Sequence, residues 1–154
     1  MKVLIALDES AASARAARAA TRLFAPVPGS EFLVINVSRV PAPWVGGAGF
    51  GTVTPLGVDP EWLTHVGEDS EHEVDLMARA QSIGVPEPEP LVRAGDPVTE
   101  ICRAAADHHV DVIVVGSHDK TALRRLFDPS VATGVVRGTS VPVLVVSGHA
   151  DEES

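Results

Sequence analysis

The 154-residue chain has little cysteine, and this limits how the fold can be stabilised. Cys102 is its single cysteine, so no disulfide can form within the chain. A protein that does without disulfides is typical of a reducing compartment. We therefore expect a cytoplasmic location.

Long apolar runs and excess positive charge are also missing. The longest apolar runs end within about ten residues, whereas a membrane-spanning helix needs roughly 20. The chain carries 12 Lys and Arg against 21 Asp and Glu, with a formal net charge of −9. This balance disfavours general binding to nucleic acids or anionic membranes, so neither is expected as a partner. The opening stretch MKVLIALDES has one lysine, a short apolar run and two acids, which predicts a strand rather than a signal peptide.

Several common phosphate-binding patterns are absent or misplaced. No Walker-type GK[ST] occurs, and the turn after the first predicted strand, LDESAA, contains no glycine where a dinucleotide fold needs its glycine fingerprint. The stretch GGAGFG at 46–51 has GxGxxG spacing, but it follows proline-rich coil and opens no helix. A flexible hinge is the favoured interpretation there. The Asp8–Glu9 pair would suit a phospho-receiver domain, but no lysine follows the last predicted strand.

The sequence does contain regular alternation of apolar runs and helical patterns. Strands are predicted at residues 2–7, 31–37, 89–94, 111–116 and 141–146. The first, fourth and fifth are nearly continuous in Val, Leu and Ile, as expected of strands buried on both faces of a parallel sheet. Helices are predicted at 11–24 with Ser10 as N-cap, at about 60–83, from Pro97 with Asp96 as N-cap, and at about 130–137. The alternation predicts an α/β fold with a doubly wound parallel sheet.

Two segments fall outside this pattern. Residues 38–59 form a predicted loop of about twenty residues, long enough to suggest a lid or a partner surface, although an excursion without a role is an equal alternative. Residues 148–154 form an acidic tail that we expect to be disordered. The rest, residues 1–147, is expected to be a single domain.

Four stretches carry a family resemblance over residues 2–146. They are VLIALDES, the GDP before the third predicted helix, DVIVVGSH and VPVLVV. Through them the chain resembles the universal stress protein family, small cytoplasmic α/β proteins of which some bind ATP. The resemblance implies a flavodoxin-like (adenine-nucleotide-hydrolase-like) sheet of five strands in the order 3-2-1-4-5.

The family's nucleotide motif, G-x2-G-x9-G-[ST], is only partly present. Aligned from Gly116, its second glycine falls at Asp119, its third at Pro129 and its hydroxyl at Ser130. A carboxylate about 4 Å from a phosphate charge, at an effective dielectric of about 20, is repelled by roughly 4 kcal/mol. Proline has no N–H to donate. The motif therefore predicts a weakened phosphate site.

Neighbouring charges act in both directions. Asp128 is placed to cap the following helix, where a phosphate would otherwise rest. Lys120, Arg124 and Arg125 offer compensation, or form a solvated helix face.

The resemblance also implies which residues would touch a nucleotide. Asp8 and Val37 match positions where the family contacts adenine or ribose, and Leu7 joins them by strand alignment. The phosphate side would comprise Gly116, Ser117, His118, Asp119, Ser130 and Val131. Each has a plainer alternative: Asp8 and Ser130 as local caps, Gly116 as a tight-turn residue and His118 as a solvent-exposed side chain.

Other chemistry is poorly supported. His65, Asp69 and His72 share one helical face, but without a fourth ligand a solvated acidic face is favoured over a metal site, and no metal is expected. Cys102 lies in an apolar helical setting that predicts a core role. No Ser–His–Asp order or carboxylate pair supports hydrolysis.

These observations predict a non-catalytic stress-response or interaction protein that binds ATP weakly or not at all. The alternative is a switch that binds an adenine nucleotide, ATP or AMP, with at best slow hydrolysis. The last strand, 141–146, is expected at the sheet edge and carries no charge. Such an edge invites pairing, and many members of the family dimerise through this strand, so a homodimer is expected. An unidentified protein partner is the other expected contact.

Overall fold

The structure is a computed structural model that describes residues 1–38, 68–117 and 131–147. The predicted loop beyond Ser38, the segment 118–130 and the tail 148–154 lie outside these ranges. So do residues 60–67 of the second predicted helix.

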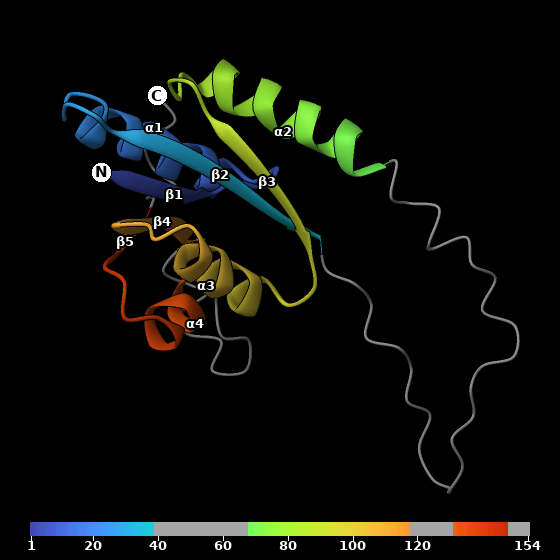
Figure 1. Cartoon of the computed structure of the whole chain (residues 1–154), viewed down its shortest axis with the longest axis vertical. Coiled ribbons are helices and arrows are strands. Elements are labelled where there is room, and N and C mark those ends of the chain that lie inside the picture. Colours follow the sequence, from blue (N-terminus) through green and yellow to red (C-terminus); the bar gives the residue numbers. More distant parts are fainter. Residues whose placement is uncertain (39–67, 118–130, 148–154) are drawn as a thin grey trace, which may run out of the picture.

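A single parallel sheet forms the centre of the molecule (Figure 1). Its strands are β1 Lys2–Ala6, β2 Glu31–Ser38, β3 Glu89–Ala94, β4 Val112–Ser117 and β5 Val143–Ser147. The five strands lie in the order β3-β2-β1-β4-β5, and every neighbouring pair is parallel. The predicted doubly wound fold and its strand order are confirmed.

Four helices connect the strands in the described ranges. They are α1 Ala11–Phe24, α2 Glu68–Ile83, α3 Pro97–Asp107 and α4 Val131–Gly138. Both predicted N-caps are present, because the side chain of Ser10 accepts a hydrogen bond from Ser13 N and that of Asp96 accepts one from Thr99 N. None of the helices described is both long enough and apolar enough to cross a membrane.

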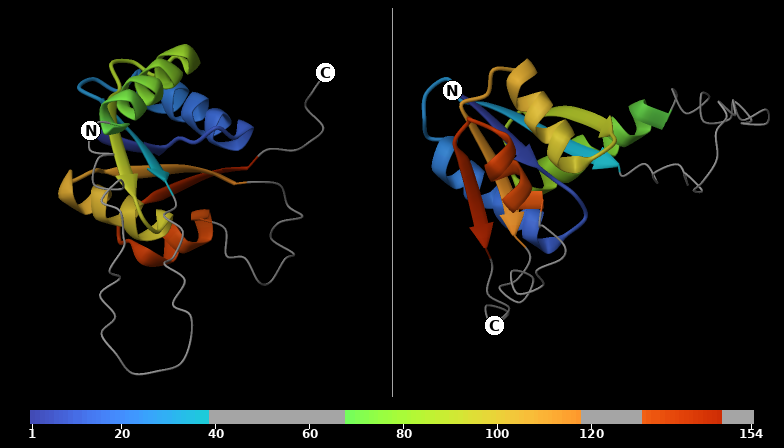
Figure 2. Two further views of the ribbon diagram at one scale, coloured as in Figure 1. Left: turned by 90° about the vertical axis from the view of Figure 1, so that its right-hand side faces the viewer. Right: turned by 90° about the horizontal axis from the view of Figure 1, so that it is seen from below.

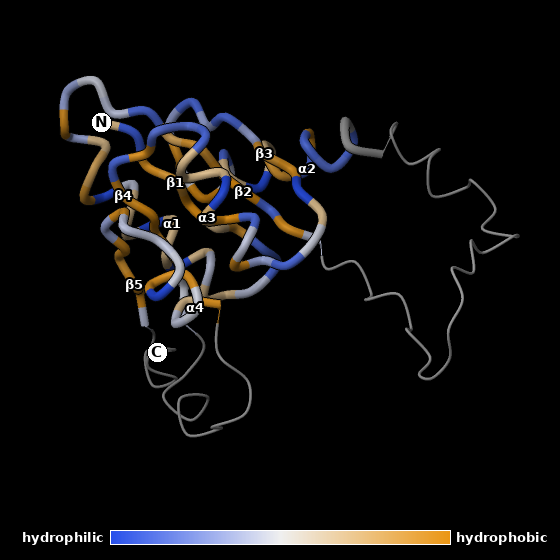
Figure 3. Tube along the Cα trace, turned by 60° about the horizontal axis from the view of Figure 1, so that its bottom comes forward, coloured by the Kyte–Doolittle hydropathy of each residue, from blue (hydrophilic) through white to orange (hydrophobic). Residues whose placement is uncertain are grey.

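The helices cover the two faces of the sheet in pairs, α1 and α2 on one face and α3 and α4 on the other (Figure 2). Side chains alternate along the central strands, so that Val3 and Ile5 of β1 pack towards α1 and α2 while Leu4 packs towards α3 and α4. The apolar strands accordingly run through the interior between more polar helices (Figure 3). Alanines at positions 16, 17 and 20 let α1 lie close to the sheet.

The edge strand β5 departs from one prediction. It was expected to be buried on both faces, but its residues are half-buried or exposed, and Val145 is 41% exposed. It also begins at Val143 rather than at Val141. Pro142 has no amide proton to donate, and Val141 N donates to Thr139 Oγ1 at 3.1 Å instead of to β4.

Candidate functional site

The predicted site residues lie at the carboxyl ends of the strands. β1 is flanked by β2 on one side and by β4 on the other, so the winding direction reverses between β1 and β4. Ligands of open α/β sheets bind at such a reversal. Leu7 and Asp8 directly follow β1, Val37 lies near the end of β2, and Gly116 and Ser117 end β4. The fold therefore brings these five residues to one edge of the sheet.

The turn from β1 to α1 is closed by its own hydrogen bonds. Ser10 N donates to Asp8 Oδ1 at 2.7 Å, and Ser13 N donates to Ser10 Oγ at 3.1 Å. Asp8 N in turn donates to Ser13 Oγ at 3.2 Å. Three backbone amides at the start of α1 are thus bonded to protein oxygens. Asp8 has the local capping role that was its plainer alternative, and its side chain remains exposed at this edge.

Gly116 is required by packing rather than by a turn. Its φ is not in the positive range that favours glycine. A β-carbon at this position would overlap the carbonyl group of Ala12 and lie 2.8 Å from Ser13 N. The missing side chain therefore lets the end of β4 approach the first turn of α1.

The end of β2 contributes two neighbouring residues. Val37 is half-buried, packs against the cluster under α3 and α4, and lies opposite Arg93 of β3. Asn36 projects towards the other face and donates from Nδ2 to Leu7 O at 2.9 Å. Asn36 was not among the predicted site residues. The signal for it was present, since it is a lone amide in the apolar run EFLVINV.

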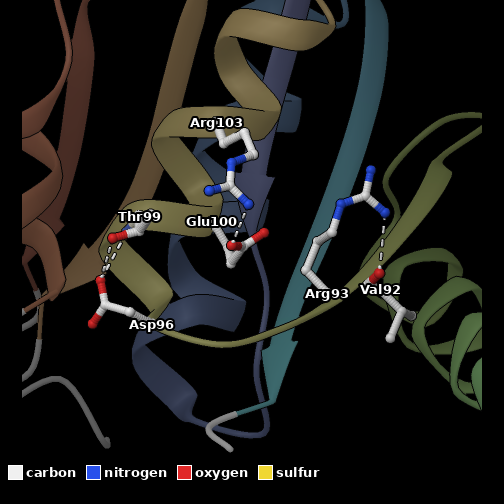
Figure 4. Close-up of polar contacts among 6 residues, drawn as sticks. All are labelled: Val92, Arg93, Asp96, Thr99, Glu100 and Arg103. Atoms are coloured by element: carbon white, nitrogen blue, oxygen red, sulfur yellow. Dashed lines mark hydrogen bonds and ion pairs between the residues drawn. The ribbon is translucent and has the colours of Figure 1, made fainter. Parts of the chain in front are cut away.

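The start of α3 lies at the same edge and is rich in polar contacts (Figure 4). Asp96 Oδ2 accepts from Thr99 N at 2.9 Å and from Thr99 Oγ1 at 2.8 Å. Glu100 Oε1 accepts from Arg103 NH1 at 2.9 Å. Arg93, half-buried in β3, donates to Val92 O at 3.2 Å (Figure 4).

The charge of this edge is predominantly acidic in the part that the structure describes. Asp8, Glu9 and Asp96 are exposed, while the cation Arg103 is neutralised by Glu100. Such an edge attracts a polyphosphate less well than it accepts a neutral or singly charged ligand.

The remaining predicted residues are divided by the described ranges. Val131 is the half-buried first residue of α4. His118, Asp119 and Ser130 lie outside the described residues, as does His65 of the alternative metal site. His72 is exposed on α2, and residues 1–38, 68–117 and 131–147 contain no cluster of three or more metal-ligating side chains.

Cys102 has the predicted core position, half-buried on α3 against the cluster under α3 and α4. Burial raises the pKa of its thiol above the ordinary value of 9.0, and the negative charge of Asp96 raises it further. The thiol is therefore protonated, and poorly nucleophilic, at neutral pH.

The fold and the placement of these residues define a flavodoxin-like α/β protein with a ligand edge at its strand carboxyl ends. A sequence model of the "Universal stress protein family" matches residues 1–147. The chain belongs to the universal stress protein family.

Two proteins of Methanocaldococcus jannaschii are related in sequence. Universal stress protein MJ0531 is 32% identical over 145 residues, which cover 94% of this chain and 81% of the relative. Universal stress protein MJ0577 is 41% identical over 56 residues, and this match covers 36% of this chain and only 35% of the relative.

Solved structures share the fold. A universal stress protein in complex with cAMP superposes with a TM-score of 0.62 at 20% identity, covering 95% of this chain and 96% of that one. A universal stress protein family protein from Arabidopsis thaliana with AMP bound gives a TM-score of 0.62 at 20% identity, covering 100% of this chain and 95% of that one. At this level of identity the likeness shows the fold alone.

Proposed function

We propose that this universal stress protein is a non-catalytic stress-response protein whose adenine-nucleotide site is weakened on its phosphate side. The observation that carries the proposal is the replacement of two motif glycines by Asp119 and Pro129. The first adds a negative charge where a phosphate would approach, and the second removes a backbone donor. ATP is then bound weakly or not at all.

The geometry of the β1–α1 turn supports this proposal. The amides of Asp8, Ser10 and Ser13 already donate to protein oxygens, so they are not available to a phosphate. The acids at the same edge add to the repulsion of a triphosphate.

The adenosine side of the site keeps its matching positions, Leu7, Asp8 and Val37. Related structures hold cAMP and AMP, ligands with a single phosphate. A ligand with fewer charges loses less at an acidic edge. We infer that AMP and adenosine compete at least as well as ATP.

Titration calorimetry with ATP, ADP, AMP and adenosine, each with magnesium, tests this order. We expect the affinity to fall as phosphates are added. An ATP dissociation constant below about a micromolar, roughly −8 kcal/mol, would contradict the proposal.

A companion experiment restores the motif. The double variant Asp119→Gly with Pro129→Gly is expected to strengthen ATP binding while leaving adenosine binding unchanged. A matched control is Asp111→Gly, an aspartate at the amino end of β4, where the substitution should leave ATP affinity unaltered. Equal ATP affinity in the double variant and the wild type would place the phosphate site elsewhere.

The alternative function is a switch that binds an adenine nucleotide and hydrolyses it slowly at best. The observation that favours it is the presence of AMP and cAMP in related structures. Absorbance of the supernatant after denaturing the purified protein separates the two functions. A stoichiometric adenine nucleotide would favour the switch, and none would favour the non-catalytic protein.

We further infer a homodimer formed through β5, and a cytoplasmic location. β5 lies at the sheet edge, and its exposed Val145 adjoins the half-buried Val143, Leu144 and Val146. Antiparallel pairing of two copies about a two-fold axis would satisfy the free backbone edge and cover these side chains. A single cysteine and the absence of disulfides support the location. The unit is residues 1–147, with 148–154 as an acidic tail.

A further inference from the structure

The peptide group between Leu7 and Asp8 is held by two side chains from different elements. The pairing of β1 with β2 ends at Ala6 and Ile35, although Leu7 N still donates to Ile35 O at 2.9 Å. Beyond that point Asn36 Nδ2 of β2 donates to Leu7 O at 2.9 Å, and Ser13 Oγ of α1 accepts from Asp8 N at 3.2 Å. Both polar ends of one peptide group are therefore fixed where the sheet pairing stops.

Ser13 is placed for this task and for little else. It is the one buried polar residue in the described part of the chain, with 5% of its surface exposed. Its Oγ lies 3.0 Å from both Asp8 O and Ser10 O, so the hydroxyl proton always has an acceptor while Asp8 N is bound. Gly116 packs against Ser13 N on the side of β4, which prevents Ser13 from moving in that direction.

Asn36 has its orientation set by chemistry. The carbonyl of Leu7 can only accept, so the amide nitrogen of Asn36, and not its oxygen, must face it. An aliphatic side chain at this half-buried position would pack as well against the apolar residues around it. The amide therefore serves the contact with Leu7 rather than the core.

We propose that Ser13 and Asn36 are positioning residues that orient the Leu7–Asp8 peptide group, and with it the Asp8 carboxylate, for an adenosine ligand. This inference rests on the proposed function, which assigns the adenosine side to Leu7 and Asp8. A ligand that meets a preformed peptide group loses no affinity to ordering it. Loss of either side-chain contact lets the peptide group rotate and weakens binding although neither side chain touches the ligand.

The test uses the full-length protein, with adenosine and AMP as the ligands titrated. Ser13→Ala and Asn36→Leu are each expected to weaken binding of both ligands by about three- to tenfold, the range for one hydrogen bond. Thr21→Val is the matched control. It removes a contact of the same kind on the same helix, Thr21 Oγ1 to Ala17 O at 2.9 Å, away from the carboxyl edge, and should leave affinity unchanged. Ser13→Thr keeps the hydroxyl and should restore most of the affinity.

Hydrogen exchange of the Asp8 amide gives a readout that general destabilisation does not move. It should accelerate at least tenfold in Ser13→Ala relative to the wild type, and remain at the wild-type rate in Thr21→Val. Unchanged Asp8 exchange, or unchanged adenosine affinity in both Ser13→Ala and Asn36→Leu, would overturn the inference.

The failure of the proposed function looks different. A wild type that binds neither adenosine nor AMP at millimolar concentration contradicts that function and removes the ligand from this inference. The exchange experiment on the free protein then still decides whether Ser13 holds the peptide group.

Discussion

The carbonyl group of Ala12 in α1 occupies the space that a β-carbon on Gly116 in β4 would need. The end of β4 is thereby joined to the start of α1, and the turn that carries Asp8 lies directly beside the strand that leads to the altered phosphate motif. The two halves of the candidate site consequently share one rigid contact between backbones.

Replacing Gly116 by alanine should destabilise the protein by about 1–3 kcal/mol, because backbone atoms on both sides leave no room for a methyl group. Urea unfolding followed by circular dichroism measures the change. Gly134→Ala is the control, since there the added carbon meets only the side chain of Val98, at 2.5 Å, and alanine favours the helix. An equal loss in both variants would argue against the backbone contact as the cause.

Removing the cap of α3 should also lower stability. Asp96→Ala deletes both contacts to Thr99 and is expected to cost about 0.5–2 kcal/mol in the free energy of unfolding. Asp96→Asn preserves a side-chain acceptor and should lie close to the wild type. If the alanine and asparagine variants unfold at the same denaturant concentration, the cap contributes nothing measurable.

The thiol of Cys102 should titrate above its ordinary value. Burial first, and the charge of Asp96 second, raise the pKa of the folded thiol above 9.0. As the pH rises past 9.0 the unfolded chain loses its thiol proton first, so stability falls until the pH passes the raised pKa of the folded state. Alkylation rates measured against pH should show a midpoint above 9.0 in the native protein.

Two variants separate the causes of that shift. Asp96→Asn removes the charge and should lower the alkylation midpoint of Cys102, while Glu100→Gln, a charge on the same helix that is not among the causes, should leave it unchanged. A native midpoint at or below 9.0 would mean that the thiol is not desolvated.

The homodimer predicts a concentration-independent mass of two chains at micromolar concentration. Val143→Lys with Val145→Lys places charges on the edge strand and should yield monomers in light scattering. Val74→Lys is the control, because Val74 is 67% exposed on α2, remote from β5 in the sheet order. A wild-type mass near that of one chain would end the dimer hypothesis.

Most of the fold was predictable because its signals are local. Apolar runs marked all five strands, and Ser10 and Asp96 marked the starts of α1 and α3. The exception was β5, whose composition resembles that of the central strands. Composition reports how apolar a strand is, whereas exposure depends on whether a further strand lies beyond it, and β5 has none in this chain.

The site was predictable only in part. The carboxyl-end positions of Leu7, Asp8, Val37 and Gly116 follow from the alternation of strands and helices, together with a resemblance to a family. The amino-acid sequence by itself therefore determined the elements, their order along the chain and the chemical character of the altered motif. Tertiary structure decided why residue 116 must be glycine and why Asn36 interrupts an apolar strand. Both answers depend on contacts across the sheet, Gly116 with Ala12 and Asn36 with a carbonyl 29 residues away. Such contacts form only after the crossovers have placed separate elements side by side, and no local pattern encodes which backbone atoms will then meet.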